Sequence, residues 1–585
     1  MGVMLNKIQK NNYPYEEKQL PYPELRGMDL YGGGGFAYLE NMYIDYDGGG
    51  DAVESIVGFR KIRAMKAGIH SLCQIGRENC RVLIIHSGDR LYLGRVNERD
   101  KGLPLKEIGR LRDGESTVLA ATDRAVLTDG ERLISVTDEG KVTLLSEDKK
   151  IAGCRCGTIY GERLFLSGNP DFRGEVFYSS PISQDDISFF RGFSEGDTEV
   201  ISLISLDGRL WVFKKDMGGS SAVCHTEEKE GDSLSFPVTM LIDPLDICSN
   251  VGMFGREIIF MSSGGLMAID FSTGKEARLI CRSAKINRLL LREELSNAKF
   301  AVWMGYLVIS FGERVYLADP RDIGGYGWYL LNGIGGYRDE KRLFRYSDKA
   351  EEGLLLHPKA NAMAEGEIFS IGREAGEMIY YSKEADECYS VYPTAELYGG
   401  EFVPHFNLIS DGKLMWFVTE AGGLYLFNND KRGCYPSDVQ FADLDGENMY
   451  RPSDTAIHPL YYSFAGHAPS YIALIHPQDR KRTEREGDGL HKRCKIDLKA
   501  ISDKGVTVLV MNNEKELSSH KIAPTKQSKA NGNANEAPTR HRDFVIVRLP
   551  EPRRGVSGEQ LCITADEFAS PFGIRSVKCL THTKK

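Results

Sequence analysis

One short pattern recurs along the first three-quarters of the chain and limits its fold more than any other feature. In it, a turn containing Gly or Asp precedes a charged residue, after which aliphatic and aromatic residues alternate, as in GDRLYL at 88–93. Gly and Asp favour tight reversals of the backbone, and apolar alternation is typical of a half-buried strand. Further copies begin at Asp129, Gly161, Asp207, Gly255, Gly312 and Asp411.

The spacing of this pattern predicts a β-propeller. Its basic residue recurs after 42, 31 and 46 positions over the first four copies, at Arg90, Arg132, Arg163 and Arg209. Periods of about 40 to 50 residues, each with four strands, are typical of propeller blades. We therefore expect an all-β protein in which residues 55–450 form about seven blades. Six or eight blades, or an array of β-sandwiches, are the alternatives.

The remaining parts of the chain differ from this repeat. Residues 1–54 are expected to form an N-terminal arm and a first strand. Strand-like runs after residue 450 are spaced further apart and predict a β-sandwich at 451–585, in which the polar segment 521–542 is a mobile loop. Helical periodicity is convincing only within 281–299, where we expect a short helix between blades.

Charge is unevenly distributed between these parts. Residues 1–450 contain 51 Lys and Arg against 68 Asp and Glu, whereas residues 451–585 contain 23 against 15. Such asymmetry marks separate modules, and an acidic main body argues against general coating of nucleic acid. The basic residues of 480–493 are candidates for contact with an acidic neighbour or a nucleic-acid backbone, and a solvated loop is the simpler alternative: Arg480, Lys481, Arg482, Lys492 and Arg493.

Cysteine use and the termini suggest a protein made and kept in a reducing compartment. The twelve cysteines are scattered and include no CxxC pair, which favours free thiols over a disulfide framework. The first twenty residues lack the apolar run of a signal peptide, and no stretch approaches the ~20 apolar residues of a membrane span. We expect a soluble protein that does not contact a membrane.

Motifs for catalysis are missing from the sequence. It contains no HExxH, no GxSxG, no P-loop and no GxGxxG that opens a helix. The acidic pairs Asp185–Asp186 and Asp45–Asp47 are expected to be turn residues rather than glycosidase carboxylates. We predict no catalytic residue, no metal ligand and no cofactor. The four tryptophans lie in apolar runs and are expected in the blade core, with sugar binding by one of them as the alternative: Trp211, Trp303, Trp328 and Trp416.

One stretch combines four further motifs: GERLFLSGNPDF at 161–172, VFYSS at 176–180, DISFF at 186–190 and LDGRLWVFK at 206–214. Together these motifs resemble a family of tailed-phage and prophage propeller proteins. Further similarity covers most of 55–585, but the Pro-Gly pair usual before the family's Gly-Phe motif is replaced here by AVESIV at 52–57. Distant relatives in this resemblance are podoviral packaged-DNA stabilisation proteins, which form a tail hub or plug.

The resemblance implies a non-enzymatic part of a virion, at the head–tail junction or in the tail, acting as hub, adaptor or DNA-retention component. It further implies a homo-oligomeric ring in contact with portal, adaptor or tail proteins and close to packaged DNA. Such a protein is assembled into virions in the host bacterial cytoplasm. A carbohydrate- or receptor-binding propeller is the alternative, and a propeller glycoside hydrolase is a third.

Overall fold

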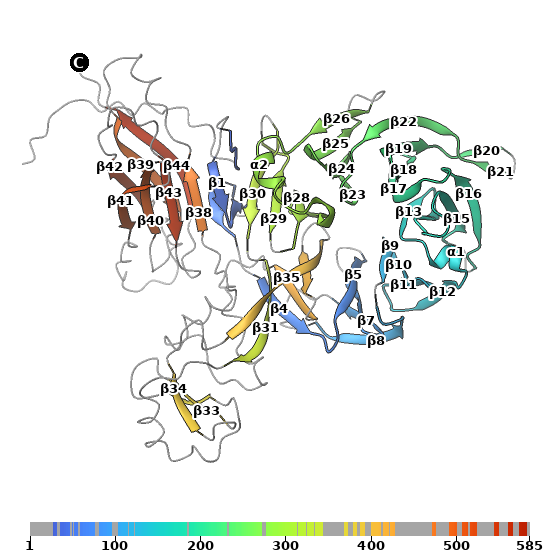
Figure 1. Ribbon diagram of the computed structural model, residues 1–585, viewed down its shortest axis with the longest axis horizontal. Helices are drawn as coiled ribbons and strands as arrows, with labels where there is room; N and C mark the ends of the chain where they lie inside the picture. Colours follow the sequence, from blue (N-terminus) through green and yellow to red (C-terminus); the bar gives the residue numbers. More distant parts are fainter. Residues whose placement is uncertain are drawn as a thin grey trace, which may run out of the picture. The chain divides into compact units, whose positions relative to one another are not determined.

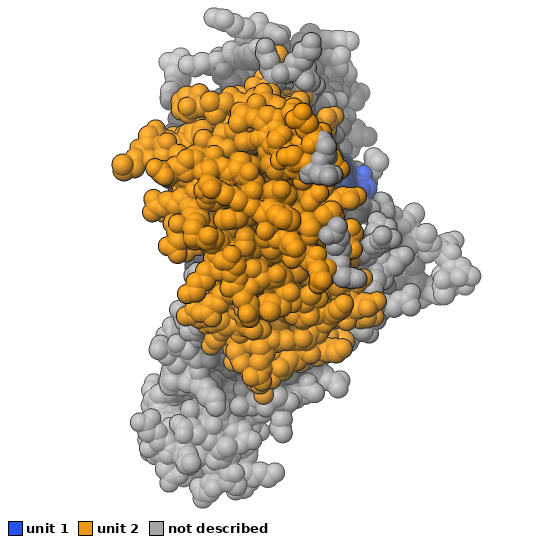
Figure 2. Space-filling model, turned by 90° about the vertical axis from the view of Figure 1, so that its right-hand side faces the viewer, with its two compact units in different colours: residues 1–56, 327–332, 469–585 blue, residues 57–326, 333–468 orange. Residues whose placement is uncertain are grey.

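The computed structural model describes residues 27–342 apart from short loops, separate strands between 368 and 427, and further strands between 471 and 581. Almost all of the described chain is antiparallel β-sheet, which confirms the predicted all-β class (Figure 1). The chain divides into a larger unit, residues 57–326 and 333–468, and a smaller unit, residues 1–56, 327–332 and 469–585 (Figure 2). Among the described residues, no helix has the length and apolar character needed to span a membrane.

The larger unit begins with sheets of four antiparallel strands that follow one another along the chain. Their strands are β5 (Ile69–Ile75), β6 (Val82–Ser87), β7 (Arg90–Arg95) and β8 (Leu105–Arg110); β9 (Thr117–Ala121), β10 (Arg124–Thr128), β11 (Leu133–Thr137) and β12 (Val142–Ser146); β13 (Cys156–Tyr160), β14 (Arg163–Ser167), β15 (Glu175–Pro181) and β16 (Phe189–Ser194). Helix α1 (Lys149–Ala152) precedes β13. Each sheet is a simple meander, in which neighbours in sequence pair with each other.

The next sheets of the larger unit have the same meander order. Their strands are β17 (Glu199–Leu206), β18 (Arg209–Asp216), β19 (Gly219–His225) and β22 (Val238–Leu245); β23 (Val251–Phe254), β24 (Glu257–Ser262), β25 (Gly265–Asp270) and β26 (Arg278–Cys281); β27 (Lys299–Trp303), β28 (Tyr306–Ser310) and β29 (Val315–Asp319). A hairpin of β20 (Glu228–Glu230) and β21 (Ser233–Ser235) interrupts the first of these sheets. The helix expected within 281–299 is confirmed as α2 (Asn287–Leu290), followed by the 3-10 turn Leu295–Asn297.

The last blade combines the two ends of the larger unit. It contains β35 (Gly399–Ser410), β36 (Met415–Thr419), β37 (Gly423–Phe427) and the early strand β4 (Phe59–Ala64), which pairs antiparallel with β37. Strand β31 (Gly335–Arg342) extends this sheet beside β35, and β32 (Ile368–Ile371), β33 (Met378–Ser382) and β34 (Glu387–Val391) form a separate small sheet.

The sheets of the larger unit close into a ring. First strands contact one another in the order β5, β9, β13, β17, β23, β27 and β35, and β35 returns to β5 (Figure 1). A closed ring of meander sheets is the arrangement of a β-propeller, so the predicted fold is confirmed. The number of blades in the whole chain stays a prediction, because residues 343–367, 392–398 and 428–470 lie outside the described parts.

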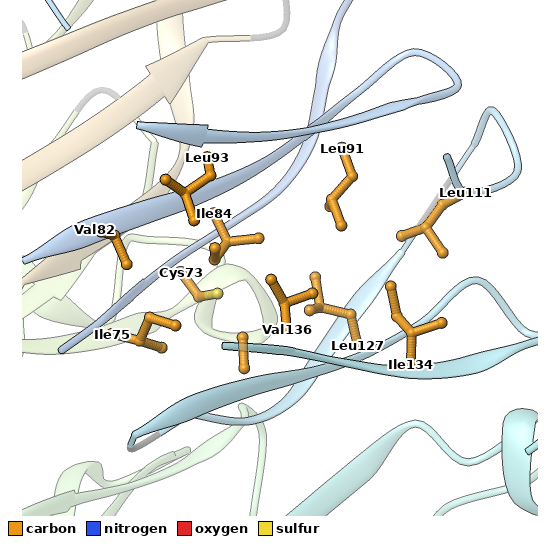
Figure 3. Close-up of a cluster of buried hydrophobic side chains, with 11 residues drawn as sticks. Cys73, Ile75, Val82, Ile84, Leu91, Leu93, Leu111, Leu127, Ile134 and Val136 are labelled. Carbon is orange, nitrogen blue, oxygen red and sulfur yellow. The ribbon is translucent and has the colours of Figure 1, made fainter. Parts of the chain in front are cut away.

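Apolar side chains between neighbouring sheets form the core. In Figure 3, Cys73, Ile84 and Leu93 of one sheet face Leu127 and Val136 of the next, and all are buried. Burial of one such side chain stabilises the fold by roughly 1.5–3 kcal/mol. All four tryptophans are at most 2% exposed. Trp211, Trp303 and Trp416 lie in blade strands, as expected, whereas Trp328 lies in β30 (Gly327–Leu331) of the smaller unit.

The recurring turn occupies two different places in the blades. At 161, 207 and 255 it joins the first and second strands, whereas at 88, 129 and 312 it joins the second and third. Turns of the same kind begin 41 residues apart at 88 and 129, and 46 and 48 residues apart at 161, 207 and 255, whereas the short step of 31 from Arg132 to Arg163 is a change from one kind to the other. The copy at Asp411 lies outside the described residues.

The smaller unit joins distant parts of the sequence in two sheets. One contains β1 (Phe36–Glu40), β30 (Gly327–Leu331), β38 (Tyr471–Ile475), β43 (Gln560–Ala565), β40 (Val506–Asn512) and β41 (Lys515–Ile522). The other contains β2 (Met42–Ile44), β3 (Val53–Ser55), β44 (Gly573–Thr581), β39 (His491–Lys499) and β42 (Asp543–Arg548). The sandwich fold and the boundaries at 54 and 450 stay predictions. Of the expected loop at 521–542, residues 521 and 522 end β41, and the rest lies outside the described residues.

Candidate functional site

The structure describes two of the five predicted basic residues. Arg480, Lys481 and Arg482 lie outside the described residues, whereas Lys492 and Arg493 are near the start of β39. There Arg493 stands opposite Arg548 of β42 in the strand register.

A polar cluster that the sequence did not indicate lies at one end of the first blade. It comprises His70 and Ser71 of β5, His86 of β6, and Asp113 and Ser116 from the loop before β9. The Ser116 hydroxyl lies 2.6 Å from the Ser71 hydroxyl and 2.7 Å from His86 Nδ1. His70 Nε2 lies 2.9 Å from Asp113 Oδ1, and the two histidine rings are 5.0 Å apart.

The hydrogen bonds of this cluster limit its chemistry. His86 is completely buried, and burial together with the charge of His70 lowers its pKa to about 4, so the ring is neutral at pH 7. A neutral histidine bonded to a serine is half of a nucleophile–base pair. Among the described residues, the other ring nitrogen of His86 has no hydrogen-bond partner, and Asp113 bonds to His70 instead. The base therefore lacks an orienting carboxylate, and the cluster serves to connect the first two blades.

One sequence signal for this cluster was present. His86 ends the otherwise apolar run VLIIHS at 82–87, where a buried polar side chain requires a partner. The partner, Ser116, is 30 positions away and belongs to no motif. Only the pairing of β5 with β6 and the course of the loop into β9 bring these side chains together.

A second buried polar group lies between the third and fourth blades. Glu195 accepts hydrogen bonds from Lys214 Nζ at 2.9 Å and from His225 Nε2 at 2.7 Å, and the ring of Phe193 stacks on His225 at 4.1 Å. Burial alone would raise the pKa of Glu195, but these two hydrogen bonds lower it below its usual value. Because His225 Nδ1 also bonds to the Phe236 carbonyl at 2.8 Å, every polar atom of the ring has a protein partner.

The stretch that carries the family resemblance runs through the third blade and into β17 and β18 of the fourth. Asn169 is buried, and its Nδ2 donates to the carbonyls of Lys149 and Lys150 at 2.9 Å each, at the end of α1. Its Oδ1 accepts from the amide of Asp171 at 3.0 Å. The buried Ser179 hydroxyl accepts from the Leu164 amide at 2.9 Å. These polar side chains are thus used to hold the blade and the preceding helix.

The other candidates give no site. Asp186 is exposed and Asp45 is buried, while Asp185 and Asp47 lie outside the described residues. No tryptophan presents an exposed face on which a sugar could stack, since all four are buried. In the described parts of the chain, no group of three or more His, Cys, Asp or Glu side chains is arranged to hold a metal ion.

Comparisons with known proteins give only remote likenesses. No protein-family model and no curated protein matches the chain. A catalytically inactive virginiamycin B lyase from Staphylococcus aureus, solved with quinupristin, is 9% identical, with a TM-score of 0.37 over 63% of this chain and 98% of the lyase. The N-terminal domain of Nup159 is 10% identical, with a TM-score of 0.29 over 66% of this chain and 98% of that domain. Neither likeness carries an argument about function.

Proposed function

We propose that the protein is a structural, non-enzymatic component of a tailed-phage virion, part of the head–tail junction or the tail. The observation that carries this proposal is that the polar side chains of the resembling stretch hold the fold together. Its buried polar side chains, Asn169 and Ser179 among them, bond within the blade and to α1. Because the residues that carry the resemblance maintain the fold, the resemblance supports a structural role shared with the phage proteins.

The charge distribution is consistent with a place beside packaged DNA. An acidic propeller repels the DNA backbone, so DNA passing along it during ejection does not adhere. The basic C-terminal part, in which Arg493 stands opposite Arg548, suits an acidic portal, adaptor or tail protein. In this proposal, the propeller lies toward the DNA path and the basic strands contact the neighbour.

Charge reversal in the basic part tests the proposal. In a producing phage, replacement of Lys481, Arg482, Lys492 and Arg493 by Glu should stop incorporation into particles, measured by immunoblotting purified virions. The matched control reverses four exposed lysines of the propeller, which should leave incorporation unchanged: Lys66, Lys106, Lys141 and Lys149. Normal particles from the first variant would contradict the proposed contact. Turnover of a glycan by the purified protein would contradict the non-enzymatic role.

A further inference from the structure

The outermost strand of the fourth blade has an unusual exposed edge. Strand β22 is eight residues long and pairs only with β19 among the described strands. Within it, Val238 and Leu241 are each 59% exposed, and the segment VTMLI at 238–242 contains no charge. The strand lies at the rim of the larger unit, next to the β20–β21 hairpin (Figure 1). A long apolar edge of this kind is a template for pairing with another strand.

Most other described outermost strands of the propeller are protected from such pairing, and β16, which exposes Phe190, carries the charged Arg191 beside it. Strand β8 presents Lys106, Glu107 and Arg110, all exposed, and β4 contains Arg60, Lys61 and Arg63. Strands β12 and β26 expose one leucine each but are only five and four residues long. Charge and shortness are the usual means of preventing edge-to-edge association. Strand β22 carries its one charge, Asp243, and its one proline, Pro244, only near its end, so the five residues at 238–242 have neither protection.

Acidic residues surround this edge. The segment 227–246 contains six Asp and Glu and a single Lys. In the β20–β21 hairpin, Glu228, Lys229 and Glu230 are all exposed, and so is Asp243 at the far end of β22. The edge therefore combines an apolar centre with negative flanks, so a basic strand is its complementary partner.

The smaller unit contains a strand with these properties. Strand β42 is the last strand of its sheet and pairs only with β39 among the described strands. Its sequence, DFVIVR at 543–548, is apolar at its centre. The three adjacent strands β44, β39 and β42 together contain seven Lys and Arg against two Asp. Strand β41, at the edge of the other sheet, is KELSSHKI and lacks such an apolar centre.

We propose that β42 of one copy pairs with β22 of the next copy, which joins the acidic propeller of one chain to the basic unit of its neighbour. The two surfaces are different, so this contact is heterologous, and its repetition gives a ring where the rotation between copies closes and an open filament where it does not. Main-chain hydrogen bonds between the edges supply affinity, and opposite flanking charges set the orientation. This inference rests on the proposed function in one respect, because the proposed virion component is itself a ring of identical copies.

Two blocked variants of the full chain test this pairing. One, V238K/L241K, places two positive charges on β22, and the other, V545K/V547K, does so on β42. We expect the wild type to form oligomers in sedimentation velocity and each variant alone to be monomeric. An equimolar mixture of the two variants should form a dimer, since each retains the edge that the other lacks. The matched control, M217K/M253K, adds the same charges at exposed positions away from β22 and should oligomerise like the wild type.

Hydrogen exchange supplies a second readout that needs no change in β42. At a concentration where the wild type is oligomeric, β42 amides should exchange at least tenfold faster in V238K/L241K than in the wild type. A monomeric wild type, unchanged association of V238K/L241K, or equal exchange of β42 in both proteins would overturn the inference. Association of V545K/V547K with itself would also overturn it, because it would show a β22–β22 contact. Ring formation by a protein missing from virions would refute the proposed function alone.

Discussion

Removal of the Asn169 side chain should loosen the third blade by a predictable amount. Asn169→Ala deletes three hydrogen bonds at a position that is 3% exposed: two to the carbonyls of Lys149 and Lys150 and one from the Asp171 amide. Each neutral hydrogen bond contributes about 0.5–1.5 kcal/mol net, so the expected loss is about 2–4 kcal/mol. Asn169→Asp should cost more than the Ala change, because it places a carboxylate oxygen against two carbonyls.

Native-state hydrogen exchange is the appropriate assay, since a chain with two units does not unfold in one step. The amides of Ala152 and Gly153, which bond within α1 to Asp148 and Lys149, report on this helix. In Asn169→Ala they should exchange about 30-fold faster or more, which corresponds to about 2 kcal/mol. Asp171→Ala removes an exposed neighbour and is the control. Exchange in Asn169→Asp as slow as in the wild type would refute the reasoning.

Three further predictions concern burial in the propeller. Burial of His86, with the nearby His70 charge, and burial of His405 lower both pKa values to about 4, while an unfolded histidine titrates near about 6.5. The free energy of unfolding should therefore fall by up to about 3 kcal/mol per histidine as the pH drops from about 6.5 to about 4. Native-state hydrogen exchange of core strand amides, corrected for the intrinsic rate at each pH, tests this, and a loss that persists in a His86→Gln/His405→Gln variant would contradict it. Phe165→Ala empties a fully buried site and should lower the free energy of opening of its blade by about 3–5 kcal/mol in the same assay, and a cost under about 1 kcal/mol would contradict the packing. Burial raises the pKa of the Cys73 and Cys154 thiols to about 12, so a maleimide should leave both unmodified until the protein unfolds, as mass spectrometry of peptides would show.

The propeller was predictable because its turns leave a strong local signal. Gly161 and Glu162 both have positive φ, at 55° and 62°, and Asp207 and Gly208 have 51° and 70°. Only a few residue types adopt this geometry readily, so the turn is visible in the sequence. Its place within the blade is not visible, because first–second and second–third strand turns require the same residues. The short step of 31 residues between Arg132 and Arg163 came from that ambiguity.

Contacts between distant residues were not predictable from local patterns. The pairing of β4 with β37 joins residue 59 to residue 427, and β1 pairs with β30 across almost 300 positions, with Glu40 opposite Leu330. The same holds for the polar cluster, in which His86 and Ser116 meet through a loop. The burial of aromatic residues was easier to predict, because Trp211 and Trp416 lie in apolar strand patterns that indicate a core position.

The most direct test of the proposed role is the protein composition of purified virions from a producing host. Quantitative mass spectrometry combined with immunogold labelling should find this chain in a fixed number of copies per particle, with label at the head–tail junction or along the tail. A chain that is missing from particles and remains free in the lysate would contradict the virion role.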